Sequence, residues 1–226
     1  MQVGLFEPQE TKLVSDLLAS VDVFVDIGAN VGYYTCLARN LGCSVLAVEP
    51  GPGTLRYLYS NLLANGFEDV EVAPVGLGST IGLRRLFGSG GGASTIKNWK
   101  SIRRVPTCVI PTTTLDRLLS HRYIEQRLFI KIDVEGAEFD VLDAGHDTLR
   151  RVPPPVWLVE IYLDRGRSGR NPRFRDTFEL FWSAGYGAVH ADRDREPVTE
   201  ALVDAWIAGG ETPATANFLF RSPSTR

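Results

Sequence analysis

Cysteine and histidine are scarce in this sequence, which has three of each among its 226 residues. The cysteines, Cys36, Cys43 and Cys108, form no C-x-x-C pair and show no zinc-ligand spacing. Their odd number argues against the disulfide framework of a small secreted protein. We therefore expect reduced thiols and a cytoplasmic protein.

Long apolar runs and an excess of positive charge are also missing. No segment approaches the ~20 apolar residues that cross a bilayer, and the start of the chain shows neither the basic nor the apolar region of a signal peptide. Lysine and arginine number 24 against 27 aspartates and glutamates, for a net charge of −3 and a pI near 5.7. The sequence thus predicts no membrane span and no nucleic-acid partner.

What the sequence does contain is a series of short apolar runs, rich in β-branched residues and separated by helical patterns. The runs are Val23–Ile27, Val45–Val48, Val70–Val75, Leu128–Ile132 and Val156–Ile161. Strands buried on both faces have this pattern, and their alternation with helices is typical of a parallel α/β sheet. We expect a single domain over residues 1–226 that begins with a helical lead-in over residues 1–20.

The last third of the chain completes the expected fold. Phe174, Phe178, Phe181 and Trp182 recur at helical spacing within residues 172–184, which predicts a helix with a buried aromatic stripe. The final apolar runs, at residues 188–191 and 217–220, are expected to pair as an antiparallel hairpin.

Residues 79–127 depart from the strand-helix rhythm. Ile81–Phe87 and Val105–Leu115 have strand patterns on either side of the glycine-rich segment Gly88–Ser94. Because residues 79–127 are too few for a core of their own, we interpret them as a β-hairpin insertion. The glycine-rich loop is either a lid over a substrate or an ordinary surface loop.

A glycine-rich turn, Val25-Asp-Ile-Gly-Ala-Asn-Val-Gly-Tyr-Tyr-Thr35, follows the first apolar run and opens a helix. Glycine lets a ligand lie against the backbone, and the start of a helix offers free N–H groups and positive potential. The same glycines would also suit a tight strand-to-helix turn that binds nothing.

An NAD-dependent oxidoreductase is the obvious competitor for this turn. A dinucleotide loop has glycine at its first, third and sixth positions, where this loop has Gly28, Asn30 and Tyr33. A side chain at the third position stands where the pyrophosphate must contact backbone, which disfavours NAD. S-adenosylmethionine has no pyrophosphate, and Asp26 with the turn through Gly32 suits its amino-acid moiety. The sequence therefore favours S-adenosylmethionine as cofactor, bound by an enzyme or by a non-catalytic scaffold.

Glu49 ends the second apolar run, directly before the turn that starts at Pro50. A carboxylate in this place can accept hydrogen bonds from both hydroxyls of a ribose. The alternative is a plain surface residue before a turn.

Further carboxylates follow the fourth and fifth runs. In Lys131-Ile-Asp-Val-Glu-Gly-Ala-Glu138, residues 131, 133 and 135 would share one face of a strand, and Glu160 closes the next strand. Ligands of open α/β sheets bind at the carboxyl edge. Asp133, Glu135 and Glu160 are therefore candidates for proton abstraction or for divalent metal binding. Alternatively, any of them pairs with Lys131 or caps the following helix.

Together these motifs resemble the FkbM family of methyltransferases, over about residues 20–220. The likeness is carried by Asp26–Thr35, Val48-Glu-Pro50, Asn61 with Asn65, Thr114-Leu-Asp116, Lys131–Glu138, Val159-Glu-Ile161 and Asn217-Phe-Leu-Phe220. The resemblance implies a Rossmann-like class I methyltransferase fold, with a seven-stranded, mostly parallel sheet whose last strand is antiparallel. It also implies O-methylation of a hydroxyl on a natural product, sugar or glycolipid.

The resemblance also assigns binding residues by position. The methionine end of the cofactor would lie against Asp26, Gly28, Asn30, Gly32 and Thr35. Glu49 would bind the ribose, Val75 and Gly76 the adenine, and Asp133 would stand beside the sulfonium. After Val75 this chain has Gly76-Leu-Gly-Ser79, where the family has an alanine and then Ser-Asp.

The expected chemistry is direct methyl transfer to an aligned acceptor oxygen, whose proton is removed by a base. Asp133, Glu135 and Glu160 are the candidate bases. A divalent metal at the same carboxylates is not favoured, because a sulfonium donor needs no Lewis acid. The expected partner is a small molecule with a hydroxyl group.

Overall fold

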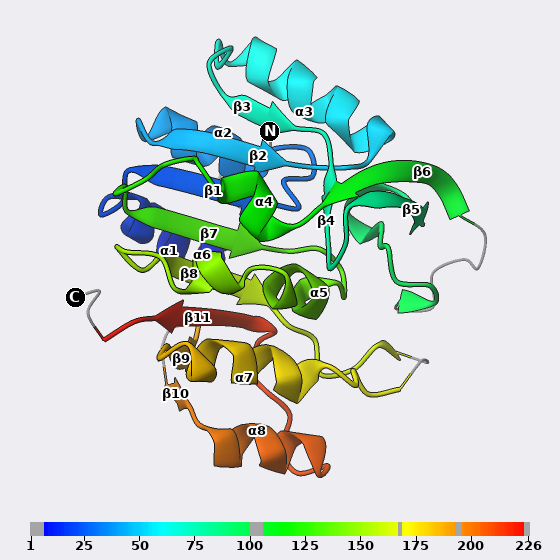
Figure 1. The fold of residues 1–226 in the computed structure, drawn as a ribbon, viewed down its shortest axis with the longest axis vertical. Helices are drawn as coiled ribbons and strands as arrows, with labels where there is room; N and C mark the ends of the chain where they lie inside the picture. Colours follow the sequence, from blue (N-terminus) through cyan, green and yellow to red (C-terminus); the bar gives the residue numbers. More distant parts are fainter. Residues whose placement is uncertain (1–6, 100–105, 167–168, 193–195, 224–226) are drawn as a thin grey trace.

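The computed structural model describes residues 7–99, 106–166, 169–192 and 196–223 (Figure 1). Its centre is an eight-stranded sheet in the order β10-β9-β11-β8-β7-β1-β2-β3. The strands are β1 Val23–Ile27, β2 Ser44–Val48, β3 Glu71–Ala73, β7 Leu128–Ile132, β8 Val156–Glu160, β9 Gly187–His190, β10 Pro197–Val198 and β11 Asn217–Arg221. The first six residues of the expected lead-in, and residues 100–105 of the expected insertion, lie outside the described part.

The expected α/β fold class is confirmed, with one difference in strand count. All five apolar runs are strands, and β3, β2, β1, β7 and β8 are mutually parallel. β11 is antiparallel to both β8 and β9, so the final apolar runs pair as expected. The sheet has eight strands instead of seven because β10, a pair of residues, adds to the edge of β9.

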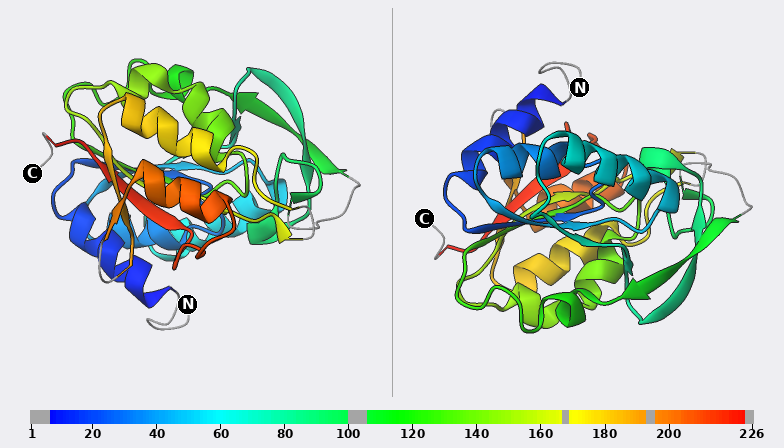
Figure 2. Two further views of the ribbon diagram at one scale, coloured as in Figure 1. Left: turned by 90° about the horizontal axis from the view of Figure 1, so that it is seen from below. Right: turned by 90° about the horizontal axis from the view of Figure 1, so that it is seen from above.

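Helices cover both faces of this sheet (Figure 2). Helices α1 Pro8–Leu18, α2 Tyr33–Asn40 and α3 Pro52–Ala64 lie on one face, where residues such as Phe24 and Phe129 are buried. The other helices are α4 Leu115–Leu119, α5 Glu138–Asp143, α6 His146–Leu149, α7 Phe174–Ser183 and α8 Glu200–Ile207, which join a second core. No helix within the described residues is long and apolar enough to cross a membrane.

The predicted aromatic stripe is found in α7. Phe174, Phe178 and Phe181 are fully buried, whereas Trp182 is only partly buried. The ring of Phe178 meets that of Phe218 edge-on, with centroids 4.9 Å apart, and Phe181 stacks on Phe220 at 3.8 Å. Because β11 supplies both partners, the stripe joins α7 to the antiparallel strand of the sheet.

A second, three-stranded sheet lies within residues 76–113. It consists of β4 Gly76–Leu77, β5 Gly82–Phe87 and β6 Pro106–Thr113, in the order β4-β6-β5. The expected hairpin is the antiparallel pair of β5 and β6. The third strand, β4, was not predicted; it pairs in parallel with β6 and connects this sheet to the end of β3. The second sheet therefore stands at the carboxyl edge of the first (Figure 1).

Candidate functional site

The glycine-rich turn lies between β1 and α2, at the carboxyl edge of the main sheet. Its backbone is left-handed at Gly28, Asn30 and Gly32, with φ values of 85°, 53° and 88°. The N–H of Gly28 donates to Val48 O at 2.9 Å, which ties the turn to the end of β2. A Cβ on Gly28 would overlap the carbonyl of Asp133, after β7, so only glycine permits this close approach.

A buried charge network lies next to this turn. Lys131 Nζ is 2.9 Å from Asp133 Oδ2, and Thr35 Oγ1 donates to Asp26 Oδ2 at 2.6 Å. Burial raises the pKa of Asp26, against the opposing effects of Lys131 and the Thr35 hydroxyl. Burial alone would lower the pKa of Lys131, but the charges of Asp133 and Asp26 outweigh it and the pKa is raised. Lys131 is therefore a buried cation that pairs with Asp133 and is stabilised further by the charge of Asp26.

Glu49 follows β2 and is buried, with 8% of its surface exposed. Its Oε2 accepts a hydrogen bond from Asn30 N at 3.0 Å, and its Oε1 accepts one from Gly51 N at 2.7 Å. Burial raises the pKa of Glu49, and the two N–H groups oppose that rise. The alternative of a plain surface residue is wrong, because this carboxylate joins two turns and lines a cavity.

Within the described residues, Gly28 of the glycine-rich turn lines two cavities. The first is formed by the ends of strands and the turns that follow them, including Ile27, Gly28, Asn30, Val48, Glu49, Val75, Gly76, Leu77, Asp133 and Glu135. The second shares Gly28, Asn30 and Asp133 with the first and adds Glu7, Asp26, Tyr33, Tyr34 and Lys131. The sheet edge therefore offers an elongated site that passes from Val75 and Gly76 to Asp26.

Most of the expected binding residues line these cavities. Gly32 and Thr35 are not among the described residues that do. A Cβ on Gly32 would overlap the side chain of Leu58, so this glycine allows α3 to pack against the turn. Thr35 is fully buried, and its hydroxyl holds Asp26. Both residues therefore stabilise the glycine-rich turn and do not line its cavities.

Three carboxylates meet at the ends of β7 and β8. One oxygen each from Asp133, Glu135 and Glu160 lies within 4.8 Å of the others. Asp133 continues the strand ladder, because its N–H donates to Ile27 O at 2.9 Å. The prediction that Glu135 shares a strand face with residue 131 is wrong, because its φ of 53° turns the chain toward α5. The cluster offers proton acceptors as well as the hard oxygen ligands that Mg²⁺ prefers.

Glu160 is partly buried beside Asp133. Burial raises the pKa of Glu160 to about 8, and the negative charge of Asp133 adds to the rise. The hydroxyl of Tyr162 donates a hydrogen bond to Glu160 Oε1 at 2.8 Å, which opposes the rise in the pKa of Glu160. Near neutral pH the Asp133–Glu160 pair therefore holds a proton.

Glu138 begins α5 and is also buried. Its Oε1 accepts a hydrogen bond from Gly136 N at 2.8 Å, and burial raises its pKa to about 7. This contact secures the turn that carries Glu135. A carboxylate at the start of a helix is the sequence signal for such a structural role.

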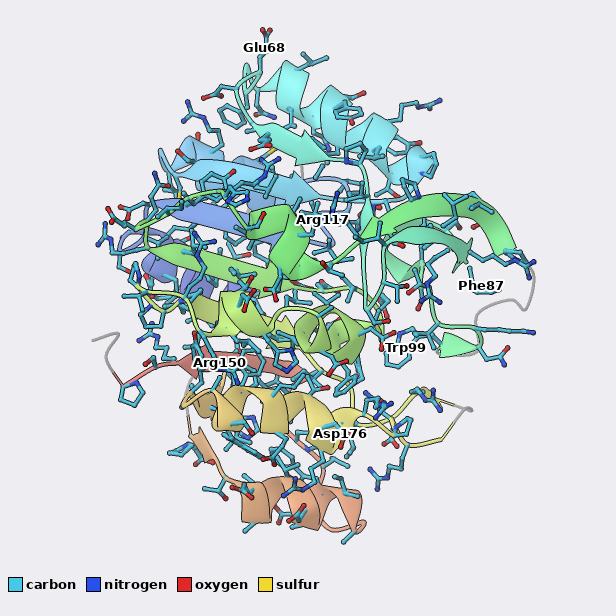
Figure 3. The ribbon with its side chains drawn as sticks, in the orientation of Figure 1. Glu68, Phe87, Trp99, Arg117, Arg150 and Asp176 are labelled. Carbon is cyan, nitrogen blue, oxygen red and sulfur yellow. The ribbon has the colours of Figure 1, made fainter. Side chains whose placement is uncertain are left out.

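Three residues that form hydrogen bonds with Glu135 or Glu160 were not predicted from the sequence. Trp99 Nε1 donates to Glu135 Oε2 at 2.7 Å, and Ser94 Oγ donates to Glu135 O at 2.6 Å. The third is Tyr162, whose nearness to Glu160 in the chain was the available signal. Ser94 ends the glycine-rich segment after β5 and Trp99 follows it, and no sequence spacing connects these residues with the motif after β7. Figure 3 shows Trp99 on the side toward which the β7 arrow points.

These residues fit S-adenosylmethionine and not a dinucleotide. The Gly28 turn forms a cradle that a Cβ would fill, and Asn30 presents a side chain where a dinucleotide loop needs bare backbone. Glu49, Asp133 and Glu135 line the same cavity. The strand order and this site define a class I methyltransferase that uses S-adenosylmethionine.

The sequence comparison identifies the family within that class. The model of the methyltransferase FkbM domain matches residues 26–187, well over half of the chain. The chain belongs to the FkbM methyltransferase family. No curated protein matches it.

Solved methyltransferase structures resemble this one at low sequence identity. The O-methyltransferase from Bacillus cereus in complex with SAH is 12% identical, the match covers 96% of this chain and 82% of that one, and the TM-score is 0.50. SAH-bound PaMTH1 from Podospora anserina is 10% identical, with 95% and 77% covered and a TM-score of 0.48. Precorrin-6y C5,15-methyltransferase from Geobacter metallireducens is 15% identical, with 83% and 76% covered and a TM-score of 0.47. The first of these similarities supports the fold alone.

Proposed function

We propose that this enzyme methylates a hydroxyl oxygen of a small molecule, such as a natural product, a sugar or a glycolipid. The observation that carries the proposal is the convergence of Asp133, Glu135 and Glu160 beside the Gly28 turn. A hydroxyl keeps its proton at neutral pH, so its methylation is accelerated by a positioned base. The carboxylates stand where an acceptor would meet the cofactor of a class I fold.

The binding roles follow from position in the site. Bound S-adenosylmethionine would supply a methyl group on a sulfonium, an electrophile that needs no activation. The turn at Gly28 and Asn30, with Asp26, would hold its amino-acid end, and Val75–Gly76 its adenine. Glu49 would accept the ribose hydroxyls, because each of its oxygens has a lone pair beyond the one used by a backbone N–H.

The acceptor's proton would pass to one of the carboxylates. Asp133 is held by Lys131, which makes Glu135 and Glu160 the more available bases. The pKa of Glu160 is raised to about 8, so Glu160 can accept the acceptor's proton only in the fraction of molecules in which it is ionised. No metal is needed in this scheme, because Lys131 offsets part of the negative charge.

Ligand binding separates this proposal from its rivals. Thermal unfolding is measured with S-adenosylmethionine, SAH and NAD in parallel, each at about 100 times the dissociation constant expected, where binding adds about 2.7 kcal/mol of stability. Stabilisation by SAH and not by NAD is expected. Stabilisation by NAD alone would favour the oxidoreductase.

Acceptor chemistry is tested next with labelled donor and a panel of hydroxylated compounds, each paired with its amino and deoxy analogues. Methylation of the hydroxyl compounds alone is expected. Methylation of the amines instead would contradict O-methylation, and donor binding without any turnover would favour a non-catalytic scaffold.

We also propose a cytoplasmic location and a single domain over residues 1–226, with residues 79–127 as an insertion. Free thiols at Cys36, Cys43 and Cys108 support the location. The glycine-rich loop lies against the site, since a Cβ on Gly91 would be 2.7 Å from the side-chain nitrogen Nδ2 of Asn30.

A further inference from the structure

Glu135 has a backbone conformation that its surroundings must impose. Its φ is 53°, and that of the next residue, Gly136, is 99°. Left-handed backbone is unusual for a residue with a side chain and persists where contacts determine it. The contacts of Glu135 therefore show what holds it at the sheet edge.

Two side chains from the region after β5 bind Glu135. Ser94 Oγ donates to its backbone carbonyl at 2.6 Å, and Trp99 Nε1 donates to its carboxylate at 2.7 Å. One bond holds the backbone and the other holds the functional group. We refer to residues 94–99 as the anchor segment.

The anchor segment is itself fixed to the second sheet. Phe87 and Ser94 exchange backbone hydrogen bonds of 2.8 and 2.9 Å at the end of β5. Ser94 Oγ also accepts a hydrogen bond from Ile96 N at 2.9 Å. Figure 3 shows Phe87 and Trp99 on the same side of the molecule, beyond the end of β7. A chain of hydrogen bonds thus connects the end of β5 with Glu135.

The indole of Trp99 is enclosed at this point, with 1% of its surface exposed. A Cβ on Gly136 would overlap the indole ring, so the glycine serves both the turn and the packing. The ring also meets Tyr162 edge-on, with centroids 6.3 Å apart, and Tyr162 donates to Glu160. Each of these two aromatic residues therefore donates a hydrogen bond to one carboxylate of the cluster.

We infer that Trp99 is a positioning residue, which directs the Glu135 carboxylate toward the methyl acceptor through its indole N–H. An indole orients a carboxylate without cancelling its charge, whereas Lys131 forms an ion pair with Asp133. The inference rests on the proposed function, in which Glu135 faces the reacting atoms.

The first test observes the hydrogen bond directly and needs no activity. The indole N–H resonance of Trp99 is assigned by its disappearance in Trp99→Phe. In Glu135→Ala this resonance should move upfield, while that of Trp182, on α7, should stay in place. An unchanged Trp99 resonance in Glu135→Ala would overturn the inference.

The second test measures the consequence for the site. Sinefungin carries a primary ammonium where S-adenosylmethionine carries its transferable methyl, so it senses carboxylates directed at the acceptor position. In Trp99→Phe, calorimetry should show about threefold to tenfold weaker sinefungin binding, as for the loss of one well-placed contact. SAH affinity should stay within about twofold, and Glu135→Gln should behave in the same way. Trp182→Phe is the matched control and should change neither affinity.

The outcomes keep the inference apart from the proposed function. Normal SAH binding with an unchanged sinefungin-to-SAH ratio in Trp99→Phe would overturn the inference and leave the function intact. Failure of the wild-type protein to bind either compound would contradict the function, while the resonance test still decides the hydrogen bond. If Trp99→Phe does not fold, Glu135→Gln carries the second test, and an unchanged sinefungin-to-SAH ratio there would overturn the inference.

Discussion

Carboxylates at one edge of the sheet differ in their roles because their partners differ. Glu49 accepts hydrogen bonds from two backbone N–H groups, and Asp133 forms an ion pair with the buried Lys131. Glu160 lies beside Asp133 and accepts a hydrogen bond from Tyr162. Burial raises the pKa of Glu49 and of Glu160, and their hydrogen-bond donors oppose the rise. The carboxylate group thus joins two turns, forms an ion pair and provides a candidate base within one site.

Replacement of Glu49 should weaken cofactor binding. Hydrogen bonds to a charged group contribute roughly 1.5–3 kcal/mol, so Glu49→Ala should lose on the order of tenfold to several hundredfold in SAH affinity by calorimetry. Because Glu49 also accepts from Asn30 N and Gly51 N, a lower melting temperature is expected as well. Glu68→Ala, at an exposed position, is the control. An unchanged dissociation constant for SAH would mean that Glu49 only joins the two turns and does not bind the cofactor.

Glutamine in place of Glu135 or Glu160 should remove the base and preserve the shape of the site. Turnover should fall by about 10²–10⁴-fold in one or both variants, with S-adenosylmethionine affinity within about threefold. If Glu160 is the base, the wild-type rate should rise as the pH passes about 8, where Glu160 loses its proton, and Glu160→Gln should abolish this rise. Wild-type rates in both variants would exclude these residues from proton transfer.

At the scale of elements, the site depends on which strands are neighbours. β1 pairs with β7 in register, Ile27 opposite Ile132, so the turn after β1 meets the chain after β7. Gly28 is needed because the carbonyl of Asp133 lies where its side chain would be. The pairing of β7 with β8 then brings Glu160 beside Asp133.

The junction of α7 and β11 should be sensitive to cavity formation. Phe178 is fully buried and contacts the rings of Phe174, Trp182, Phe218 and Phe220. Phe178→Ala should therefore lower the free energy of unfolding by about 3–5 kcal/mol in a urea titration.

The control for this prediction is Leu63→Ala on α3, because 64% of the surface of Leu63 is exposed. That change should stay within about 0.5 kcal/mol of the wild type. A loss below about 1 kcal/mol for Phe178→Ala would mean that the helix relaxes into the space left by the ring.

For the whole molecule, buried carboxylates should make stability depend on pH. The pKa of Glu138 is raised to about 7 and that of Glu160 to about 8, so the folded protein binds more protons than the unfolded chain between about pH 4.5 and 8. Their contribution is fully present below the unfolded pKa and is lost as the pH rises through these values. The melting temperature of the ligand-free protein should therefore fall from pH 5 to pH 8.5.

Glu138→Gln should reduce this fall, because glutamine keeps an oxygen for Gly136 N and has no proton to lose. Differential scanning calorimetry across the pH range makes the comparison. Asp147→Asn, at an exposed position of α6, should leave the slope unchanged. A slope in Glu138→Gln equal to that of the wild type would show that this carboxylate stays charged in the folded state.

The sequence by itself determined where most strands of the main sheet lie, which glycine-rich turn lies at their carboxyl edge and which carboxylates end the strands. Apolar runs, glycine spacing and helical periodicity are local patterns, because burial on two faces and left-handed turns constrain neighbouring residues. Even the family resemblance rests on such short segments. The two-residue strands β4 and β10 left no pattern long enough to predict.

Only the tertiary structure decided which of these residues meet. The left-handed turn at Glu135, its hydrogen bond from Trp99 and the raised pKa of Glu160 depend on groups far apart in the chain. Gly32 and Thr35 support the turn instead of lining its cavities for the same reason, since Leu58 and Asp26 occupy their surroundings. Contacts of this kind follow from strand order and from the packing of the second sheet onto the first, which no local pattern encodes, because their energies arise only when distant segments exclude water together.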